Sequence, residues 1–507
     1  MNPLQVAFRV DSSSLIGRGH LTRCLTLANE LTRRGAVVRF VCREQPGDLI
    51  ARAEAMGYPV ARLPDAGDLP GLSQETDAQA TLDQLQDVRP DLLVVDHYEL
   101  DARWERALRG VASRLFVIDD LASREHDCDV LLDQNYLGAA TADRYDGLVP
   151  AGCQLLLGPT YALLAPEYAG LRVLRPPRDG SVRRLLVFFG GGDQDGDTLR
   201  VLQALDCAEL ESLAVDVVTG GHSGNAAIER WVSGRPAATL YRGLDSLAPL
   251  IAQADLAIGA GGSTTWERAC LGVPAVVATV AHNQQAIASA LAQDGYQLLL
   301  GESRKLSAAD WRAALISIVA QPQRLALIAS RAATLTDGNG CLRVAEVVLR
   351  RAPALTLRDA DSNDARLFFD WANDPAIRDM SFSSEPIEWA GHVRWLQAKL
   401  GDSRSRIYVA LHNSEPVGQI RFEISDDVDA EVGVHTKPGL QGMGIGSQLI
   451  ALGLVRLRES SAVATVHARI KPGNARSLRA FQRAGFVEAD RQMVNGNECV
   501  HLVRKLQ

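Results

Sequence analysis

The stretch QVAFRVDSSSLIGRGHLTRCLTLANEL, residues 5–31, decides the fold of the first part of the chain. It opens with an apolar run, Gln5–Asp11, that is typical of a buried strand. A polar turn with two glycines follows. After the turn, apolar residues recur at the three- and four-residue spacing of a helix: Leu21, Cys24, Leu25, Ala28 and Leu31. A strand, a turn and a helix in this order form the unit from which parallel sheets are built.

The same unit repeats through residues 1–170. Strand-like runs occur at Val37–Cys42, Leu92–Val95 and Leu115–Ile118, with helical segments such as Asp101–Val111 between them. Because strands that alternate with helices must run parallel, the repeat predicts a parallel sheet with helices on both faces.

A second block of this kind follows the basic stretch Arg172–Arg184. Its first strand, Leu185–Phe189, runs directly into three glycines. Further strands are predicted at Leu213–Val218, Leu256–Ile258 and Val276–Val280. We therefore expect an α/β fold with two doubly wound, Rossmann-type lobes, residues 1–170 and 180–350, and a ligand cleft between their carboxyl strand ends.

The pattern changes after Ala352-Pro353-Ala354. Residues 355–507 contain alternating strand candidates and then a Gly-rich turn before a helix. The strand candidates are Ile407–Leu411, Pro416–Ile424 and Ala430–Thr436. The sequence predicts a separate α+β domain here.

Composition and charge exclude several classes of protein. The 507 residues include 53 Lys and Arg against 61 Asp and Glu, a net charge of −8 that argues against general binding to nucleic acid or to an anionic membrane. The start MNPLQVAFRVDSSS lacks the charged and apolar regions of a signal peptide, and no apolar run reaches 18 residues. The eight cysteines are scattered without a CxxC pair, so we expect reduced thiols in a cytoplasmic protein and no metal site.

The turn after the first strand carries candidate chemistry. Gly17 and Gly19 allow close backbone approach, and the following helix start offers unpaired N–H groups to an anion. His20 lies at the same junction, and an imidazole that exchanges protons near neutral pH suits a general base. A histidine that only caps or packs against the helix is the alternative. Arg9 and Asp11 are equally consistent with a structural ion pair beneath the loop.

The second block carries a nucleotide-like pattern. The run Gly259-Ala260-Gly261-Gly262-Ser263-Thr264-Thr265-Trp266-Glu267 follows a strand and opens a helix, which suits a diphosphate, with Glu267 placed to accept hydrogen bonds from a ribose. Gly190-Gly191-Gly192 would approach the diphosphate from the other side. Neither loop is GxGxxG in a dinucleotide-binding arrangement or GxxxxGK[ST], and each is also consistent with a plain Gly-rich turn.

Together these motifs resemble a known family. Arg9-x-Asp11-x-Ser13-x-x-Ile16-Gly17-x-Gly19-His20-x-x-Arg23-Cys24-x-x-Leu27-Ala28 is similar to the signature of the UDP-sugar hydrolases of pseudaminic-acid biosynthesis. Further matching segments, within a resemblance that spans roughly residues 4–345, are Val95-Asp96-His97-Tyr98, Ile118-Asp119-Asp120-Leu121, Gly158-Pro159-x-Tyr161-Ala162-Leu163-Leu164 and Ala281-His282-Asn283-Gln284. The resemblance implies the GT-B architecture of MurG-like glycosyltransferases. It also implies hydrolysis of UDP-2,4-diacetamido-2,4,6-trideoxy-β-L-altropyranose to the free sugar and UDP.

The resemblance also implies roles for residues. His20 would deprotonate a water that attacks C1 of the sugar, Glu267 would bind the ribose, and no metal is expected. Asp96 and Asp119 would orient His20, bind the sugar or cap loops. The expected substrate-binding residues are Asp11, Ser13, Gly19, Asp96, Tyr98, Tyr161, Gly191, Gly262, Ser263, Glu267, Asn283 and Gln284.

The last part of the chain resembles the GNAT acyl-CoA N-acetyltransferases. The resemblance rests on Gln441-Gly442-Met443-Gly444-Ile445-Gly446-Ser447 and on Asn474-Ala475-Arg476-Ser477-Leu478-x-x-Phe481-x-x-x-Gly485-Phe486. It implies acetyl-CoA as co-substrate, with its pyrophosphate held by backbone amides of the first motif. The expected cofactor-binding residues are Val434, Gln441, Gly442, Gly444, Gly446 and Asn474.

One position departs from the GNAT pattern. Many of these enzymes carry a Tyr seven residues after the motif Asn as general acid toward the CoA thiolate, and here that residue is Phe481, which has no proton to donate. Candidate bases for the amine proton are Glu423, Glu431 and His435, and the sequence does not choose among them.

Two such parts on one chain suggest consecutive steps on one nucleotide sugar, with tethering that raises the effective concentration. A MurG-like glycosyltransferase, or a non-catalytic UDP-sugar-binding module fused to an acetyltransferase, remains an alternative. The expected partners are a nucleotide sugar and acetyl-CoA, with no nucleic acid and no membrane, and the sequence leaves the oligomeric state open.

Overall fold

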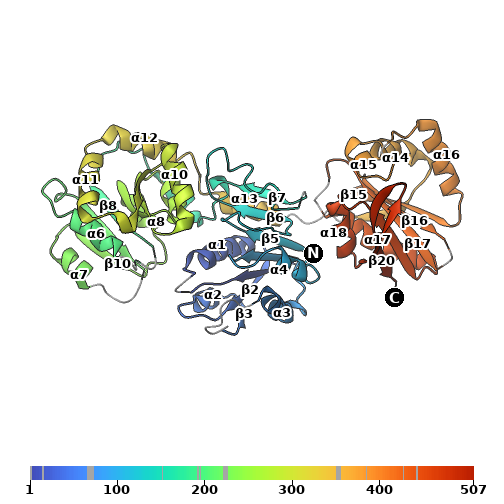
Figure 1. Ribbon diagram of the computed structural model, residues 1–507, viewed down its shortest axis with the longest axis horizontal. Helices are drawn as coiled ribbons and strands as arrows, with labels where there is room; N and C mark the ends of the chain where they lie inside the picture. Colours follow the sequence, from blue (N-terminus) through green and yellow to red (C-terminus); the bar gives the residue numbers. More distant parts are fainter. Residues whose placement is uncertain are drawn as a thin grey trace. The chain divides into compact units, whose positions relative to one another are not determined.

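The computed structural model divides the chain into two compact units, Met1–Val149 with Leu155–Leu349, and Pro150–Gln154 with Arg350–Gln507. Figure 1 shows the helices and strands of each unit. The structure describes residues 3–13, 16–65, 73–150, 152–190, 193, 196–220, 226–349, 355–383, 385–425, 428–440 and 444–506.

The first unit begins with a seven-stranded sheet in the order β3-β2-β1-β4-β5-β6-β7, in which the pairs from β3 to β6 are parallel. Apolar residues of β1 alternate between the two faces, with Phe8 packed in the core beneath α1. Arg9 points to the opposite face, where it meets α3. The strands are β1 (Gln5–Val10), β2 (Val37–Arg43), β3 (Val60–Leu63), β4 (Leu92–Asp96), β5 (Arg114–Ile118), β6 (Val130–Asp133) and β7 (Gln154–Leu157), and the helices are α1 (Gly19–Arg33), α2 (Ile50–Ala55), α3 (Gln74–Leu85), α4 (Ala102–Leu108), the 3₁₀ turn η1 (Pro159–Tyr161) and α5 (Pro166–Leu174).

A second sheet of six parallel strands in the order β10-β9-β8-β11-β12-β13 completes this unit. Separate apolar clusters lie on its two faces, so helices cover both, as the sequence predicts. The strands are β8 (Arg184–Phe188), β9 (Ala214–Thr219), β10 (Ala238–Arg242), β11 (Leu256–Ala260), β12 (Ala275–Thr279) and β13 (Leu298–Glu302), and the helices are α6 (Asp197–Ala204), α7 (Ala226–Ser233), α8 (Ala248–Gln253), α9 (Thr264–Cys270), η2 (His282–Gln284), α10 (Gln285–Gln293), η3 (Ser303–Lys305), α11 (Ala308–Val319) and α12 (Pro322–Ala332). The first unit is therefore a pair of doubly wound Rossmann-type lobes.

Helix α13 (Gly340–Val348) follows the second sheet in the chain but packs with the first. Its apolar residues Cys341, Val344 and Val348 belong to the same core as Phe8, and Figure 1 shows α13 beside β5 to β7. The sequence pattern groups this helix with residues 180–350, because an amphipathic helix does not reveal which sheet its apolar face covers.

The second unit contains a mixed sheet in the order β14-β15-β16-β17-β18-β20-β19. All described pairs are antiparallel except β17 with β18, which pair in parallel only at Asp429–Glu431 against Thr465–His467. Helix α17 covers one face, and α14 and α16 cover part of the other. The elements are β14 (Thr356–Asp359), η4 (Ser362–Asp364), α14 (Ala365–Ala372), α15 (Pro375–Asp379), α16 (Trp389–Leu400), β15 (Ser405–His412), β16 (Glu415–Ile424), β17 (Asp429–Thr436), α17 (Ile445–Ser460), β18 (Thr465–Ile470), α18 (Ala475–Arg483), β19 (Val487–Val494) and β20 (Asn497–Lys505).

Within the described part of the chain, no single helix is long and apolar enough to cross a membrane. The bent pair α11 and α12, at 90°, passes that test by length and composition only.

The contact of α13 with η1 leads to a stability prediction. A Cβ built on Gly340 would lie 2.3 Å from the Ala162 carbonyl oxygen, so Gly340→Ala requires the backbone to move. We expect a loss of about 1–3 kcal/mol in the free energy of unfolding of the first unit, measured by urea denaturation. Gly170→Ala is the matched control, because a Cβ on this α5 glycine meets nothing within 4 Å. An equal loss in both variants would contradict the packing described here.

Candidate functional site

A buried ionic cluster supports the loop that follows β1. The Arg9 guanidinium binds the Asp11 carboxylate at 2.5 Å and the Asp77 carboxylate of α3 at 2.6 Å. Asp11 also accepts hydrogen bonds from the Arg43 backbone N–H and pairs with His97 Nε2 at 3.2 Å. Burial alone would raise the pKa of Asp11, but Arg9 and His97 hold it far below its usual range. The structural ion pair considered from the sequence is therefore present, and direct contact of Asp11 with substrate stays a prediction.

The loop itself is closed by Ser13. Its carbonyl accepts from the Gly17 N–H at 2.8 Å and its hydroxyl accepts from the Ile16 N–H at 3.0 Å. Gly17 has φ +85°, a conformation that favours glycine. The loop so formed leads into the first turn of α1, which carries His20.

His20 is 7% exposed, and the carboxylate of Asp96 at the end of β4 holds its ring. The distance from His20 Nδ1 to Asp96 Oδ1 is 2.5 Å. The Tyr98 ring meets the imidazole edge-on, with centroids 4.5 Å apart. Because an ionised carboxylate only accepts, Nδ1 carries the proton, and Nε2 is left as the ring nitrogen with a free lone pair. His20 thus has the geometry of a base oriented by a carboxylate.

Arg23, one turn along α1 from His20, fixes this carboxylate. Its Nε and Nη2 both lie 2.6 Å from Asp96 oxygens, and its Nη1 donates to Asp120 at 2.9 Å. Burial opposes ionisation of Asp96, yet Arg23 and His20 keep its pKa well below the usual range. A bidentate guanidinium fixes the plane of a carboxylate, so Arg23 sets the direction in which Asp96 holds His20.

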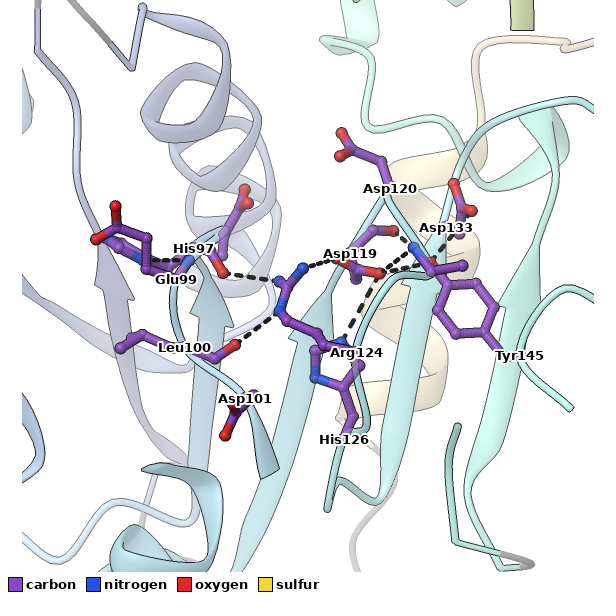
Figure 2. A network of polar contacts seen from close by, with 12 residues as sticks. His97, Glu99, Leu100, Asp101, Asp119, Asp120, Arg124, His126, Asp133 and Tyr145 are labelled. Atoms are coloured by element: carbon purple, nitrogen blue, oxygen red, sulfur yellow. Dashed lines mark hydrogen bonds and ion pairs between the residues drawn. The ribbon is translucent and has the colours of Figure 1, made fainter. Parts of the chain in front are cut away.

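A second polar network holds the segment after Asp96 (Figure 2). Arg124 donates to the carbonyl oxygens of His97 at 2.9 Å and Leu100 at 3.0 Å, and its guanidinium pairs with Asp119 at 2.9 Å. The Tyr145 hydroxyl donates to Asp119 at 2.9 Å. Of the two aspartates considered as orienting groups for His20, Asp96 fills that place, and Asp119 supports the loops behind it.

The nucleotide-like motif of the second lobe comes close to this loop. A Cβ on Gly19 would lie 4.0 Å from Ser263 Oγ, and one on Gly262 would lie 3.8 Å from Gln284 Nε2. The turn after β1 and the turn after β11 are thus neighbours, as expected for two lobes that share a ligand. Ser263 is exposed and makes no side-chain hydrogen bond to cap α9.

Glu267 lies in α9 with its Oε2 atom buried and without a hydrogen-bond partner in the described residues. Burial raises the pKa of Glu267 to about 7, although a hydrogen bond from Tyr168 and the charge of Arg268 act in the opposite direction. A buried carboxylate oxygen without a donor is expected where a ligand supplies one.

Two other residues expected to bind substrate lie in short 3₁₀ turns of the first unit. Tyr161 ends η1 and packs against the first core, and Asn283 is exposed in η2. Gly191 lies outside the described residues, as do Gln441 and Gly442. The structure adds three residues to which the sequence reasoning gave no role: Arg23, Arg124 and Tyr168. Of these three, only Arg23 could have been identified from the sequence, because its spacing of three residues from His20 places both side chains on one face of a helix.

In the second unit, the expected CoA motif lies where β17 and β18 separate. Gly444 has φ +76° and precedes α17, and a Cβ on Gly446 would lie 3.7 Å from Ala480 of α18. Val434 lies on β17 beyond the last pair with β18, and Asn474 caps α18 by accepting from the Ser477 N–H. The strand end, the glycines and both helices therefore meet in one place that suits an extended, phosphate-bearing cofactor.

The ion pairs of Arg23 with Asp96 and Asp120 lead to a prediction about how stability depends on pH. Arg23→Gln leaves two carboxylates without their shared cation, and we expect a loss of about 3–5 kcal/mol near pH 7. Because the folded pKa of Asp96 lies far below its unfolded value near 4, its contribution to stability is complete above about pH 5 and is lost only as pH falls below about 4. The difference from wild type should therefore be constant between about pH 5 and 8 and shrink at lower pH, which urea denaturation between about pH 2 and 8 measures. Arg33→Gln, an exposed arginine of the same helix, should change little at any pH, and a similar loss there would refute the assignment.

Comparisons with known proteins agree with this division. The family model for the acetyltransferase (GNAT) domain matches residues 354–487. An uncharacterised protein of Methanocaldococcus jannaschii is 22% identical over 502 residues, 95% of this chain and 96% of that protein. The UDP-2,4-diacetamido-2,4,6-trideoxy-beta-L-altropyranose hydrolase of Campylobacter jejuni is 25% identical over 297 residues, 58% of this chain and 98% of the hydrolase. Acetyltransferase PseH of the same species is 25% identical over 133 residues, 26% of this chain and 82% of that enzyme.

Among solved structures, MurG of Acinetobacter baumannii is 16% identical, with a TM-score of 0.49, over 68% of this chain and 99% of that one. The sequence relatives and the family model support a fusion of a part that resembles a UDP-sugar hydrolase with a part, residues 354–487, that matches the GNAT acetyltransferase domain.

Proposed function

We propose that this protein carries out two steps on one nucleotide sugar of pseudaminic-acid biosynthesis in the cytoplasm. The first unit hydrolyses UDP-2,4-diacetamido-2,4,6-trideoxy-β-L-altropyranose to the free sugar and UDP. The second unit transfers an acetyl group from acetyl-CoA to the 4-amino group of its precursor. The observation that carries the hydrolase proposal is the His20 ring, held at Nδ1 by a carboxylate beside the turn of the second lobe.

In the proposed hydrolysis, His20 Nε2 takes a proton from water as the water oxygen bonds to C1 of the sugar. The bond from C1 to the UDP oxygen breaks, and its electron pair leaves with UDP. Asp96 then stabilises the imidazolium, as an orienting carboxylate does for other histidine bases. The His20–Asp96 geometry and the 98% coverage of the hydrolase relative support this assignment.

Binding of UDP is proposed for the facing turns. The first N–H groups of α1, a 15-residue helix, attract the diphosphate, and Ser263 lies within reach of the same turn. Glu267 supplies the unpartnered oxygen for a ribose hydroxyl. Tyr98, Tyr161, Asn283 and Gln284 are proposed sugar or nucleotide contacts.

For the second unit, the residues fit acetyl-CoA. Gly444 and the first N–H groups of α17 are proposed to bind the pyrophosphate, and the segment of β17 that has left β18 can pair with an extended chain. Acetyl-CoA, when bound there, supplies the activated acetyl group. The GNAT family match and the PseH relative support this part of the proposal.

A labelling experiment tests the hydrolase. In ¹⁸O-water, wild type should release UDP with the label in the sugar, and His20→Gln or Asp96→Asn should lower kcat by about 10²–10⁴. His412→Ala in the second unit is the control and should hydrolyse at the wild-type rate. Label in UDP would mean attack at phosphorus. Transfer to an added alcohol in preference to water would favour a glycosyltransferase, and UDP binding without turnover would favour a non-catalytic module.

The raised pKa of Glu267 gives a prediction about nucleotide binding. A ribose hydroxyl donates to the ionised carboxylate, so UDP binding should expel a proton from this residue and strengthen as pH rises through 7. We expect about a tenfold gain in affinity between pH 6 and 8 from this group, measured by calorimetry. Glu267→Gln has no such proton, so whatever pH dependence it retains belongs to the phosphate of UDP. Identical pH dependence in both proteins would contradict the assignment of Glu267.

A further inference from the structure

The polar face of the third sheet, opposite α17, carries all three candidate bases of the acetyltransferase. Along β17, Val432 packs into the core beneath α17, so alternation turns Glu431, Gly433 and His435 to the other face. A Cβ on Gly433 would lie 3.0 Å from Arg421 Nε, which places the Arg421 side chain on this face too.

Two of the three candidates are held in ion pairs. Glu423 accepts from Lys399 Nζ at 3.0 Å, and Glu431 binds Arg469 Nη1 at 2.5 Å. A carboxylate that shares its charge with a cation is a poor proton acceptor, because ionisation is already favoured there.

His435 differs from both. It lies beyond Glu431, in the part of β17 that has separated from β18, where the acetyl group of a bound acetyl-CoA is expected. Gln419 Nε2 lies 3.0 Å from His435 Nδ1, and the Gln419 side chain is buried. The amide can turn by about 180°, and with its oxygen accepting from the Nδ1–H the ring is fixed and keeps a free lone pair at Nε2 for a reacting group.

The surroundings of His435 keep it neutral. Burial and the positive charges of Arg421 on β16 and Arg378 on α15 lower the pKa of His435 to about 4. Of the other charged groups on this face, Glu423 and Glu431 are in the ion pairs described above, and Asp429 lies 3.7 Å from His467 Nε2. A neutral imidazole can take a proton from an amine adduct, and the resulting acid, destabilised by two arginines, gives it up readily.

Phe481 cannot supply the proton that the departing CoA thiolate needs. Its ring is 4% exposed and packs edge-on against Phe486, with centroids 5.0 Å apart, so the position of the usual tyrosine acid is part of the core. The thiolate of CoA must receive its proton from elsewhere.

We infer that His435, positioned by Gln419, is the proton carrier of the acetyl transfer. The amine nitrogen bonds to the thioester carbon, and His435 Nε2 takes the surplus proton from that nitrogen. The bond from carbon to sulfur breaks, the sulfur leaves with its electron pair, and His435 returns the proton to it as CoA thiol. This inference rests on the proposed acetyltransferase function.

The test uses the full chain with acetyl-CoA and the UDP-4-amino sugar, and follows CoA thiol release and the acetylated sugar. His435→Ala and His435→Gln should lower kcat by about 10²–10³ and leave the KM for acetyl-CoA within twofold. Glu423→Gln and Glu431→Gln are the matched controls and should keep kcat within threefold. Loss of activity in Glu431→Gln with activity retained in His435→Ala would overturn the inference.

A pH profile separates a proton carrier from a structural residue. Gln419→Glu places a carboxylate against Nδ1 and favours the imidazolium, so the acidic limb of kcat/KM should move upward by at least one pH unit. An unmoved limb would overturn the role of His435. If wild type does not acetylate this amine, the proposed acceptor is wrong, and the slow hydrolysis of acetyl-CoA alone decides about His435: a rate lowered in His435→Ala supports the inference, and an unchanged rate overturns it.

Discussion

The Asp96 carboxylate, 1% exposed at the end of β4, is shared by His20 and Arg23, and the geometry of the first unit's site follows from this sharing. Removing a carboxylate from water is costly, and a bidentate guanidinium with a third donor offsets that cost only if all three groups keep their places. The arrangement therefore fixes the first turn of α1 against the sheet. It also gives His20 one defined tautomer without any ligand.

The need to pair buried carboxylates with cations also applies at the ends of the neighbouring strands. Because β4, β5 and β6 are adjacent and parallel, the acids at their ends, Asp96, Asp119, Asp120 and Asp133, crowd together at one edge. Each has a nearby cation, supplied by Arg23, Arg124 or Arg144. Asp133 is the least compensated, since burial and the charges of its neighbours raise its pKa to about 6 even beside Arg144. The loops that carry Arg124 and Arg144 are thus held to the strand ends by ion pairs.

Local pattern was enough to predict most of the fold. The strand and helix of residues 5–31, the two parallel sheets and the separate α+β domain all follow from periodicities that depend on near neighbours. The partner of His20 did not follow, because Asp96 and Asp119 both end strands and only the three-dimensional register distinguishes them. The same holds for Glu423, Glu431 and His435, whose difference lies in salt bridges formed across strands. The sequence shows which charged and polar groups lie on these strands, and packing determines which of them already form ion pairs within the protein.

Helix α13 has a consequence for how the chain is organised. Because its apolar face completes the core of the first sheet, the first lobe is discontinuous in sequence, and the whole second lobe is topologically an insertion between η1 and α13. A fragment that stops after the first sheet would lack Cys341, Val344 and Val348 of α13, which belong to the same apolar core as Phe8, Leu27 and Leu31. The domain that begins with β14 accordingly follows a helix of the first lobe in the chain, so both lobes are complete in the sequence before that domain begins.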